Sequence, residues 1–183
     1  MFYIDAMAAA ALRVFFAVWP DPLLLTSLAA LAAEVARETR GRPTASENIH
    51  LTLAFLGEQP VSRMAPLCAL AALVRGQQFA LTLDEIGCFR KAGIAWLGAS
   101  APQLELGALQ ERLAGELRAS GFPIDERPYA PHLTLARRIG VAIRRSLAAP
   151  IVWKVSSFAL MVSETTASGP NYRSLAEWPL APE

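Results

Sequence analysis

NIHLTLAFLG at residues 48–57 and APHLTLARR at residues 130–138 contain the only two histidines of the chain. Each histidine begins the same tetrapeptide, HLTL, which occupies residues 50–53 and 132–135. Leu-Thr-Leu by itself predicts only a strand, because such residues suit a half-buried pleated surface, and a third copy at residues 81–83 follows an alanine. The duplicated histidine is therefore the feature that needs an explanation.

The spacing within each tetrapeptide separates two kinds of side chain. Neighbouring side chains of a strand point to opposite faces of a sheet. His50 and Thr52 therefore share one face, and His132 and Thr134 share the corresponding face of the second copy. The leucines point to the opposite face, where we expect the hydrophobic core. Each copy thus presents an imidazole and a hydroxyl toward a common cleft.

The composition is that of a folded globular protein. Of 183 residues, 54% are hydrophobic and 18% are charged, and the net charge is +1. Such a chain can bury an ample core, and it contains no uncharged apolar run near the ~20 residues of a membrane span. The small net charge disfavours a long groove that follows nucleic-acid phosphates and favours a local grip on an end.

The N-terminal residues and the cysteines bear on the compartment. Residues 1–10 are apolar but lack a basic start, so we interpret them as a short extension and not as a secretory signal. Cys68 and Cys88 lie in apolar segments without a CxxC pattern, and we expect two buried free thiols. Unpaired thiols are typical of cytoplasmic proteins, and the cytoplasm is the compartment that we expect.

Helix and strand patterns follow each other in the same order in both halves of the chain. The first half predicts strand 13–19, helix 22–40, strand 49–56, helix 62–75 and strand 79–86. The second half predicts strand 94–98, helix 102–119, strand 132–136, a short helix 141–147 and strand 152–162. The histidine lies on the middle strand both times.

This order predicts an α+β fold in a single bilobal domain over residues 1–183. We expect two pseudo-symmetric lobes, each an antiparallel-rich sheet with helices on its outer face. A pseudo-twofold axis between face-to-face lobes would place the two H-x-T-x motifs opposite each other in a central cleft. The duplicated tetrapeptide would then build one site from two halves.

A pair of facing imidazoles suits a reaction that removes one proton and donates another. The ordinary histidine pKa of about 6.5 allows one ring to be neutral while the other is protonated. Threonine hydroxyls can donate to the non-bridging oxygens of an anion held between the rings. Phosphodiester hydrolysis or transesterification fits this set of groups best.

Other chemistries find less support in the motifs. A zinc site usually takes three or four His, Cys, Asp or Glu ligands, and only Glu47 lies near either histidine. The chain has no G-x-S-x-G nucleophile elbow, no P-loop and no G-x-G-x-x-G motif. We therefore expect neither a metal nor a cofactor.

Four stretches together resemble a known family: RVFFAVWP, NIHLTLAFLGE, RPYAPHLTLAR and GPNYRSLAEWPL. The paired H-x-T-hydrophobic motifs, about eighty residues apart, resemble the 2H phosphoesterase superfamily. The flanking residues are most similar to its RNA 2′,3′-cyclic phosphodiesterase branch, historically called 2′-5′ RNA ligases. The resemblance extends over roughly residues 12–180.

The resemblance implies metal-independent hydrolysis of a 2′,3′-cyclic phosphate, on RNA ends or small cyclic nucleotides, to a 2′-phosphomonoester. It implies His132 as the base that activates water and His50 as the acid that protonates the leaving 3′-oxygen, although the roles could be reversed. Thr52 and Thr134 would hold the phosphate. The family also has an arginine five residues after the second histidine, here Arg137.

Strict alternation along the strand places Arg138, and not Arg137, on the histidine face, so the family pattern requires the strand to twist or end near Ala136. Tyr172, in the Gly-Pro-x-Tyr pattern near the C-terminus, either stacks on a base or anchors the last strand. Arg42 either reaches the cleft mouth or is a solvated loop residue.

We expect Arg144 and Arg145 on an exposed helix face and the four tryptophans in the core. We also expect a monomer without an obligate protein partner. Two other functions stay open: reversible 2′-5′ RNA ligation, and binding of nucleotides or RNA ends without catalysis.

Overall fold

Antiparallel strands and three α-helices make up most of the described part of the chain, which in this computed structural model comprises residues 11–125, 127–166 and 169–182. The expected extension at residues 1–10 lies outside the described residues. The strands are β1 (Ala11–Val18), β2 (Arg42–Pro43), β3 (Leu51–Pro60), β4 (Phe79–Phe89), β5 (Ile94–Gly98), β6 (Leu133–Arg137), β7 (Arg145–Val155), β8 (Ser157–Thr166) and β9 (Gly169–Pro179). The helices are α1 (Pro22–Thr39), α2 (Met64–Ala71) and α3 (Leu104–Ala119), with short 3-10 turns η1 (Ser46–Asn48), η2 (Val61–Arg63) and η3 (Arg90–Ala92).

The strands form one sheet in the order β7-β4-β5-β6-β3-β1-β8-β9, and β2 pairs with β6. Its two halves, lobe A (β3-β1-β8-β9) and lobe B (β6-β5-β4-β7), meet where Leu51 of β3 pairs with Leu133 of β6. Every strand pairing of both lobes is antiparallel. The expected α+β fold with two pseudo-symmetric lobes is therefore confirmed, but the histidine strands lie side by side at the junction and not on face-to-face lobes.

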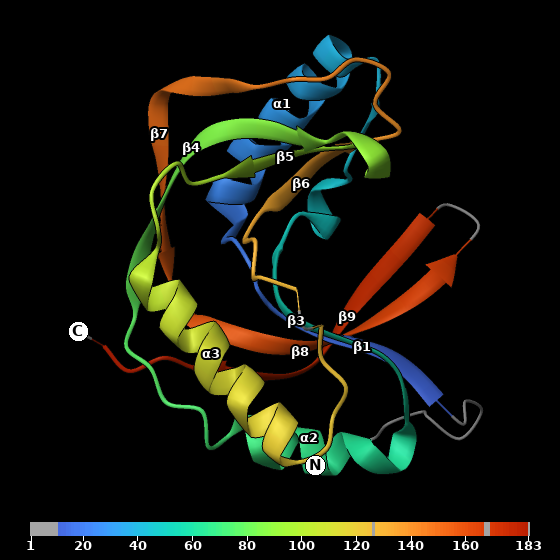
Figure 1. Cartoon of the computed structure of the whole chain (residues 1–183), viewed down its shortest axis with the longest axis vertical. Helices are drawn as coiled ribbons and strands as arrows, with labels where there is room; N and C mark the ends of the chain where they lie inside the picture. The colour runs from blue at the N-terminus through green and yellow to red at the C-terminus, as the bar shows by residue number, and fades with distance from the viewer. Residues whose placement is uncertain (1–10, 126, 167–168, 183) are drawn as a thin grey trace.

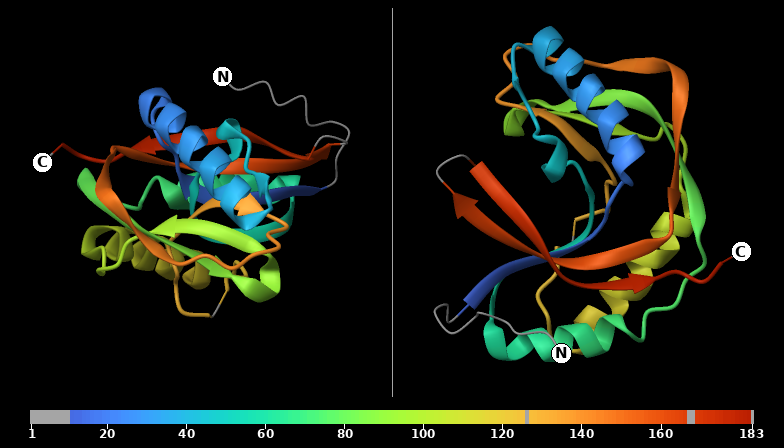
Figure 2. Two further views of the ribbon diagram at one scale, coloured as in Figure 1. Left: turned by 90° about the horizontal axis from the view of Figure 1, so that it is seen from above. Right: turned by 180° about the vertical axis from the view of Figure 1, so that it is seen from behind.

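Each lobe combines elements from both halves of the sequence, which the repeated order of elements did not predict. β4 closes the first repeat but pairs with β5 and β7 in lobe B. β8 comes from the second half but pairs with β1 in lobe A. Likewise α1 packs on β6, and α3 packs on β3 (Figures 1 and 2). The two lobes are thus tied together by strands and helices that cross between them.

Two expected elements near the C-terminus are wrong. The predicted helix 141–147 does not form: the amide N–H groups of Gly140 and Val141 both donate to the Thr39 carbonyl at the end of α1, and β7 already begins at Arg145. The predicted strand 152–162 is two strands, because the chain passes at Ser156 from lobe B to lobe A. β9, which pairs with β8 along its whole length, lies outside the repeated order of elements and is the last strand on which Tyr172 was expected.

Local signals explain α1 and the core beneath the motifs. The Asp21 carboxylate accepts from the Leu24 amide, and Pro22 occupies the first helical turn. α1 ends at Arg40 in a left-handed conformation, one residue before Gly41. The four leucines of the two tetrapeptides are at most 2% exposed, as alternation predicts.

The remaining structural expectations concern cysteines and membrane spans. Cys68 and Cys88 are both free but only half-buried, because each lies at the margin of the core. Among the helices that the structure describes, none is both long and apolar enough to cross a bilayer.

Candidate active site

A bulge follows the threonine in each histidine strand. β1 residues Phe16 and Ala17 are neighbours, yet their partners on β3 are Ala54 and Thr52, so one leucine between them is extra. The same shift occurs in β6, where consecutive residues of β5 pair with residues 136 and 134. An extra residue of this kind offsets the alternation of all residues that follow it.

This offset decides which arginine joins the histidine face. Leu135 and Ala136 are both buried, so the next side chain, Arg137, returns to the face of His132 and lines the cavity there. The expectation from strict alternation, Arg138, is wrong, because alternation ignores the bulge; Arg138 has a φ of 54° beyond the strand end. Phe55 takes the place in lobe A that Arg137 takes in lobe B.

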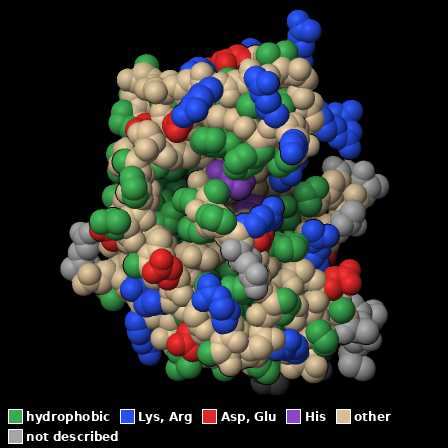
Figure 3. Space-filling view, viewed as in Figure 1, with side chains coloured by type: hydrophobic (Ala, Val, Ile, Leu, Met, Phe, Trp, Pro, Cys, Tyr) green, Lys and Arg blue, Asp and Glu red, His purple; other side chains and the backbone are tan. Residues whose placement is uncertain are grey.

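All six residues predicted for the site line one cavity of about 240 Å³ at the junction of the lobes. We call it the histidine cavity. Figure 3 shows the two histidines in a hollow, with hydrophobic and basic side chains around them. Its lining consists of Arg13, Phe15, His50, Thr52, Phe55, Ile94, His132, Thr134, Arg137, Ser163 and Tyr172.

The two imidazoles are held in the same way. The Nδ1 atom of His50 lies 2.8 Å from the Asn48 carbonyl oxygen, and that of His132 lies 2.8 Å from the Ala130 carbonyl oxygen. A carbonyl only accepts, so Nδ1 carries the proton and Nε2 presents a lone pair in each neutral ring. The His50 Nε2 lies 3.1 Å from the Thr52 hydroxyl, which can donate to it. Within the described chain, the His132 Nε2 has no hydrogen-bond partner.

Burial and nearby positive charge keep both rings neutral. Burial lowers the pKa of His50 from its ordinary value of 6.5 to about 4, and the positive charge of Arg137, together with that of His132 when its ring is protonated, acts in the same direction. Burial also lowers the pKa of His132, again with a contribution from Arg137. The hydrogen bonds to the backbone carbonyls oppose these shifts. The two imidazoles therefore present nitrogen lone pairs, and the positive charge of the cavity comes from the arginines that line it, Arg13 and Arg137.

The two histidines have different aromatic neighbours. The Trp19 ring is stacked on His50, with 4.8 Å between centroids and 12° between planes. Phe15 and Tyr172 contact the same imidazole at 5.0 and 5.1 Å. In the part of the chain described, His132 has one aromatic neighbour, Phe89, edge-on at 5.0 Å. His50 is consequently the more enclosed of the two.

Sequence reasoning missed several of these neighbours. Trp19 was expected in the core but is half-exposed beside His50. The period-2 spacing of Phe15, Ala17 and Trp19 was the available signal, since it places their side chains on one face of the first strand. Arg13 and Ser163 also line the cavity, and neither was predicted as a site residue.

The secondary candidates are now placed. Tyr172 lies in the histidine cavity, where Asn48 holds its strand by donating to the Pro170 carbonyl at 2.9 Å. Arg42 is exposed on β2 and lines none of the cavities described here. Arg144 and Arg145 were expected on an exposed helix face, which is wrong because residues 141–147 are not helical. Arg145 pairs with two carboxylates of α1, and Arg144 pairs with Glu85.

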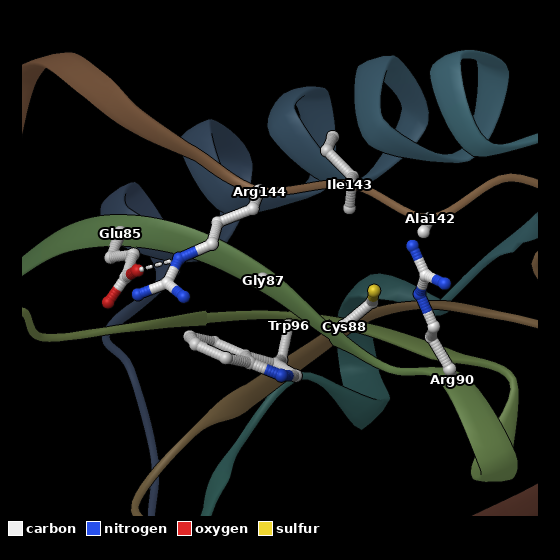
Figure 4. A pocket seen from close by; sticks show the side chains of 8 residues that line it. All are labelled: Glu85, Gly87, Cys88, Arg90, Trp96, Ala142, Ile143 and Arg144. Carbon is white, nitrogen blue, oxygen red and sulfur yellow. Dashed lines mark hydrogen bonds and ion pairs between the residues drawn. The ribbon is translucent and has the colours of Figure 1, made fainter.

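The described part of the structure has two further hollows, of which the first adjoins the histidine cavity. The wide cleft, of about 810 Å³, shares Thr52, Phe55 and His132 with the histidine cavity. The edge cavity, of about 450 Å³, lies beside the end of β4 (Figure 4). Its lining consists of Glu85, Gly87, Cys88, Arg90, Trp96, Ala142, Ile143 and Arg144. Over the residues described, no group of three or more His, Cys, Asp or Glu side chains is arranged to hold a metal ion.

Residues 20–167 match the family described as the 2′-5′ RNA ligase superfamily. The chain belongs to this family. The 2′-5′ RNA ligase superfamily is the one that the paired motifs and their flanks resemble, so that interpretation is confirmed.

Relatives within the family carry a more specific name. A protein of Escherichia coli (strain K12) named RNA 2′,3′-cyclic phosphodiesterase is 36% identical over 143 residues, which cover 76% of this chain and 80% of that protein. A protein of the same name from Thermus thermophilus is 33% identical over 187 residues, covering 94% and 92%. The crystal structure of E. coli LigT complexed with 3′-AMP superposes with a TM-score of 0.83 at 32% identity, over 93% of this chain and 98% of that one.

Proposed function

We propose that this protein hydrolyses 2′,3′-cyclic phosphates at RNA ends or on nucleotides to 2′-phosphomonoesters. The observation that carries the proposal is the convergence of His50 and His132, from equivalent strands, on one small cavity together with two threonines and Arg137. The relatives named RNA 2′,3′-cyclic phosphodiesterase support the choice of substrate.

In the proposed reaction, His132 is the base and His50 the acid. The His132 Nε2 accepts a proton from water, whose oxygen forms a bond to phosphorus. The bond between phosphorus and the 3′-oxygen breaks, and protonated His50 donates its Nε2 proton to that oxygen. The His132 Nε2 accepts no hydrogen bond from any described residue, which supports the assignment of His132 as the base.

The other residues act on the phosphate and the nucleoside. The Thr52 and Thr134 hydroxyls donate to non-bridging oxygens, and Arg137 neutralises the charge that develops there. Tyr172, which lines the cavity, stacks on the base. A bound phosphodiester anion offsets Arg137 and raises the pKa of both histidines, so the neutral pair takes up the one proton that the reaction needs.

Incubation of the purified protein with a 2′,3′-cyclic mononucleotide and a cyclic-phosphate-ended RNA, in EDTA, tests the proposal. We expect turnover of at least one substrate to a 2′-phosphate. No turnover, or strict dependence on added metal, would contradict the proposal. A 3′-phosphate product would reject the assignment of the leaving oxygen while leaving a phosphodiesterase.

Reversible 2′-5′ ligation is a second candidate, favoured by the wide cleft that opens onto His132 beside the histidine cavity. An RNA 5′-hydroxyl there would replace water as the group that His132 deprotonates. Mixing RNA pieces with cyclic-phosphate and 5′-hydroxyl ends tests this reaction. Failure to find a joined 2′-5′ product at high concentration would exclude it.

We also infer a single bilobal domain that acts as a monomer in the cytoplasm. The continuous sheet and a cavity built entirely from one chain support the first two inferences. The two free cysteines support a reducing compartment. Size-exclusion chromatography with light scattering tests the oligomeric state, and a dimer mass would contradict it.

A further inference from the structure

The flat indole ring of Trp96 forms one wall of the edge cavity. Trp96 pairs with Gly87 across β4 and β5, and its indole lies over that glycine. A Cβ on Gly87 would be only 2.3 Å from the Trp96 ring, so the absence of a side chain there permits this orientation. The Trp96 indole nitrogen is buried without a hydrogen-bond partner in the described chain. A buried donor without a partner is uncommon in a folded protein, which sets this tryptophan apart from an ordinary packing residue.

Two arginines line the edge cavity beside the Trp96 ring. Figure 4 shows Arg144 and Arg90 on the two sides of the cavity, with the Trp96 ring between them in this view. Arg144 is neutralised by Glu85 at 3.0 Å. The exposed Arg90 forms no ion pair with any described residue, so the cavity keeps an available positive charge. An aromatic face with a free guanidinium suits a nucleobase and its phosphate.

A row of rings connects the edge cavity to the catalytic pair. Trp96 pairs with Thr134, so its side chain lies on the sheet face that carries His132. Phe89, 37% exposed, lies between them, 5.6 Å from the Trp96 ring and 5.0 Å from the His132 ring. The His132 ring and the Trp96 ring of the edge cavity are therefore separated by one aromatic side chain.

The sizes of the cavities fit a substrate longer than one nucleotide. The histidine cavity, about 240 Å³, lies below the usual range of about 300–1,000 Å³ for ligand pockets, whereas the edge cavity, about 450 Å³, and the wide cleft, about 810 Å³, lie within it. The histidine cavity can take the cyclic phosphate and its ribose, and the rest of the substrate needs another surface.

We propose that the edge cavity binds the nucleotide on the 5′ side of the cyclic phosphate, with its base on Trp96 and its phosphate near Arg90. Building on the proposed function, this subsite makes oligonucleotide ends better substrates than cyclic mononucleotides. Stacking one base on an aromatic ring corresponds to about a five- to hundred-fold gain in kcat/KM.

The test compares kcat/KM for a cyclic mononucleotide, a trinucleotide with the same cyclic end, and a trinucleotide that is abasic next to that end. We expect the intact trinucleotide to be preferred about five-fold or more, and the abasic one to lose most of that preference. Arg90→Gln should reduce the trinucleotide-to-mononucleotide ratio, and Trp96→Leu should reduce it further than Trp96→Phe. Arg75→Gln, which removes an exposed charge away from all three cavities, should leave the ratio unchanged.

Three outcomes separate the possibilities. Equal kcat/KM for mononucleotide and trinucleotide would overturn the subsite and leave the proposed function standing. Arg90 lines both the edge cavity and the wide cleft, so Trp96 and Lys91, which line one each, separate the two routes. A preference that is lost in Lys91→Gln but unaffected in Trp96→Leu would also overturn the subsite, because the substrate would then leave through the wide cleft. Failure to hydrolyse any of the three substrates would instead refute the proposed function.

Discussion

His50 and His132 occupy equivalent positions and make equivalent hydrogen bonds, but their surroundings differ. His50 is enclosed by Trp19, Phe15 and Tyr172, and burial lowers its pKa to about 4. His132 is bordered by one ring and keeps a free Nε2 lone pair in the described structure. Two copies of one tetrapeptide can therefore perform different steps.

Replacing either histidine by alanine should lower kcat/KM by roughly 10²–10⁴, as for other positioned acids and bases. The losses in His50→Ala and His132→Ala should be non-additive in the double variant, since both groups act on one phosphate. Thr52→Ala and Thr134→Ala should be milder, because water can partly replace a hydroxyl. Steady-state kinetics measure these effects.

Melting curves of the same variants are the control. We expect all of them to stay folded, because the leucines on the opposite strand face form the core. Folded histidine variants with near-wild-type turnover would show that the two-histidine mechanism is wrong.

The lowered pKa values predict an acidic optimum. The reactive pair holds one proton, so kcat/KM should be bell-shaped between the pKa of His50, about 4, and that of His132, below 6.5. Raising the pH above 6.5 removes the proton and lowers kcat/KM. Arg137→Gln removes a positive charge that lowers both pKa values, so both limbs should move to higher pH.

NMR titration of the two imidazoles, beside the pH–rate profile, measures this shift. Arg138→Gln is the matched control, because it removes the same charge one residue away and outside the histidine cavity. A larger shift in Arg138→Gln than in Arg137→Gln would contradict the orientation that the bulge imposes.

At the scale of the elements, bulges and glycines determine what each strand presents. The bulge after Thr134 turns Arg137 into the histidine cavity, and its counterpart in β3 turns Phe55 there. Gly87 lets β5 lay a tryptophan across β4. In both cases the backbone of one strand decides the chemistry of the shared surface.

Gly87→Ala should destabilise the protein by about 1–3 kcal/mol, because the new Cβ would overlap the Trp96 ring and force it to move. Gly115→Ala is a control of opposite sign. Gly115 lies in α3 with nothing within 4 Å of an added Cβ, so that change should stabilise by roughly 0.5–1 kcal/mol. Urea denaturation measures both, and equal free energies of unfolding for the two variants would contradict the close packing at Gly87.

At the scale of the whole molecule, the exchange of strands makes the lobes interdependent. The strands from β4 to β7 belong to lobe B and β8 returns to lobe A, while α3, between β5 and β6, packs on β3 of lobe A. The direct strand pairing between lobes is confined to Leu51 and Leu133 in the described sheet. The strands and helices that cross between the lobes, more than the single pair Leu51 and Leu133, hold the two halves of the site in register.

We therefore expect one cooperative unfolding transition for both lobes. Leu81→Ala in β4 and Leu160→Ala in β8 remove equivalent buried side chains from different lobes. Each should cost about 2–5 kcal/mol and lower the hydrogen-exchange protection of both lobes together. Two separate transitions, or loss of protection in the mutated lobe alone, would contradict this coupling.

The sequence alone was sufficient for the family, the fold class and the paired histidines and threonines. Those features depend on periodicity over a few residues: alternation placed His50 with Thr52 and the leucines in the core, and caps such as Asp21 marked α1. Such features depend on neighbouring residues, so the local sequence predicts them. The duplicated motif added one long-range prediction, that His50 and His132 belong to the same site.

Only the tertiary structure decided which arginine enters the site, which lobe each strand joins and which aromatic rings enclose His50. A bulge depends on pairing with a neighbouring strand, so the sequence of residues 132–138 alone does not predict that Leu135 is the extra residue. The patterns of β4 and β8 likewise predict a strand but not its partner. Residues 141–147 do not form a helix, because the amides of Gly140 and Val141 donate to the Thr39 carbonyl, about a hundred residues earlier in the chain. Hydrogen-bond partners and packing surfaces distant in sequence determine these features, and they exist only once the chain has folded.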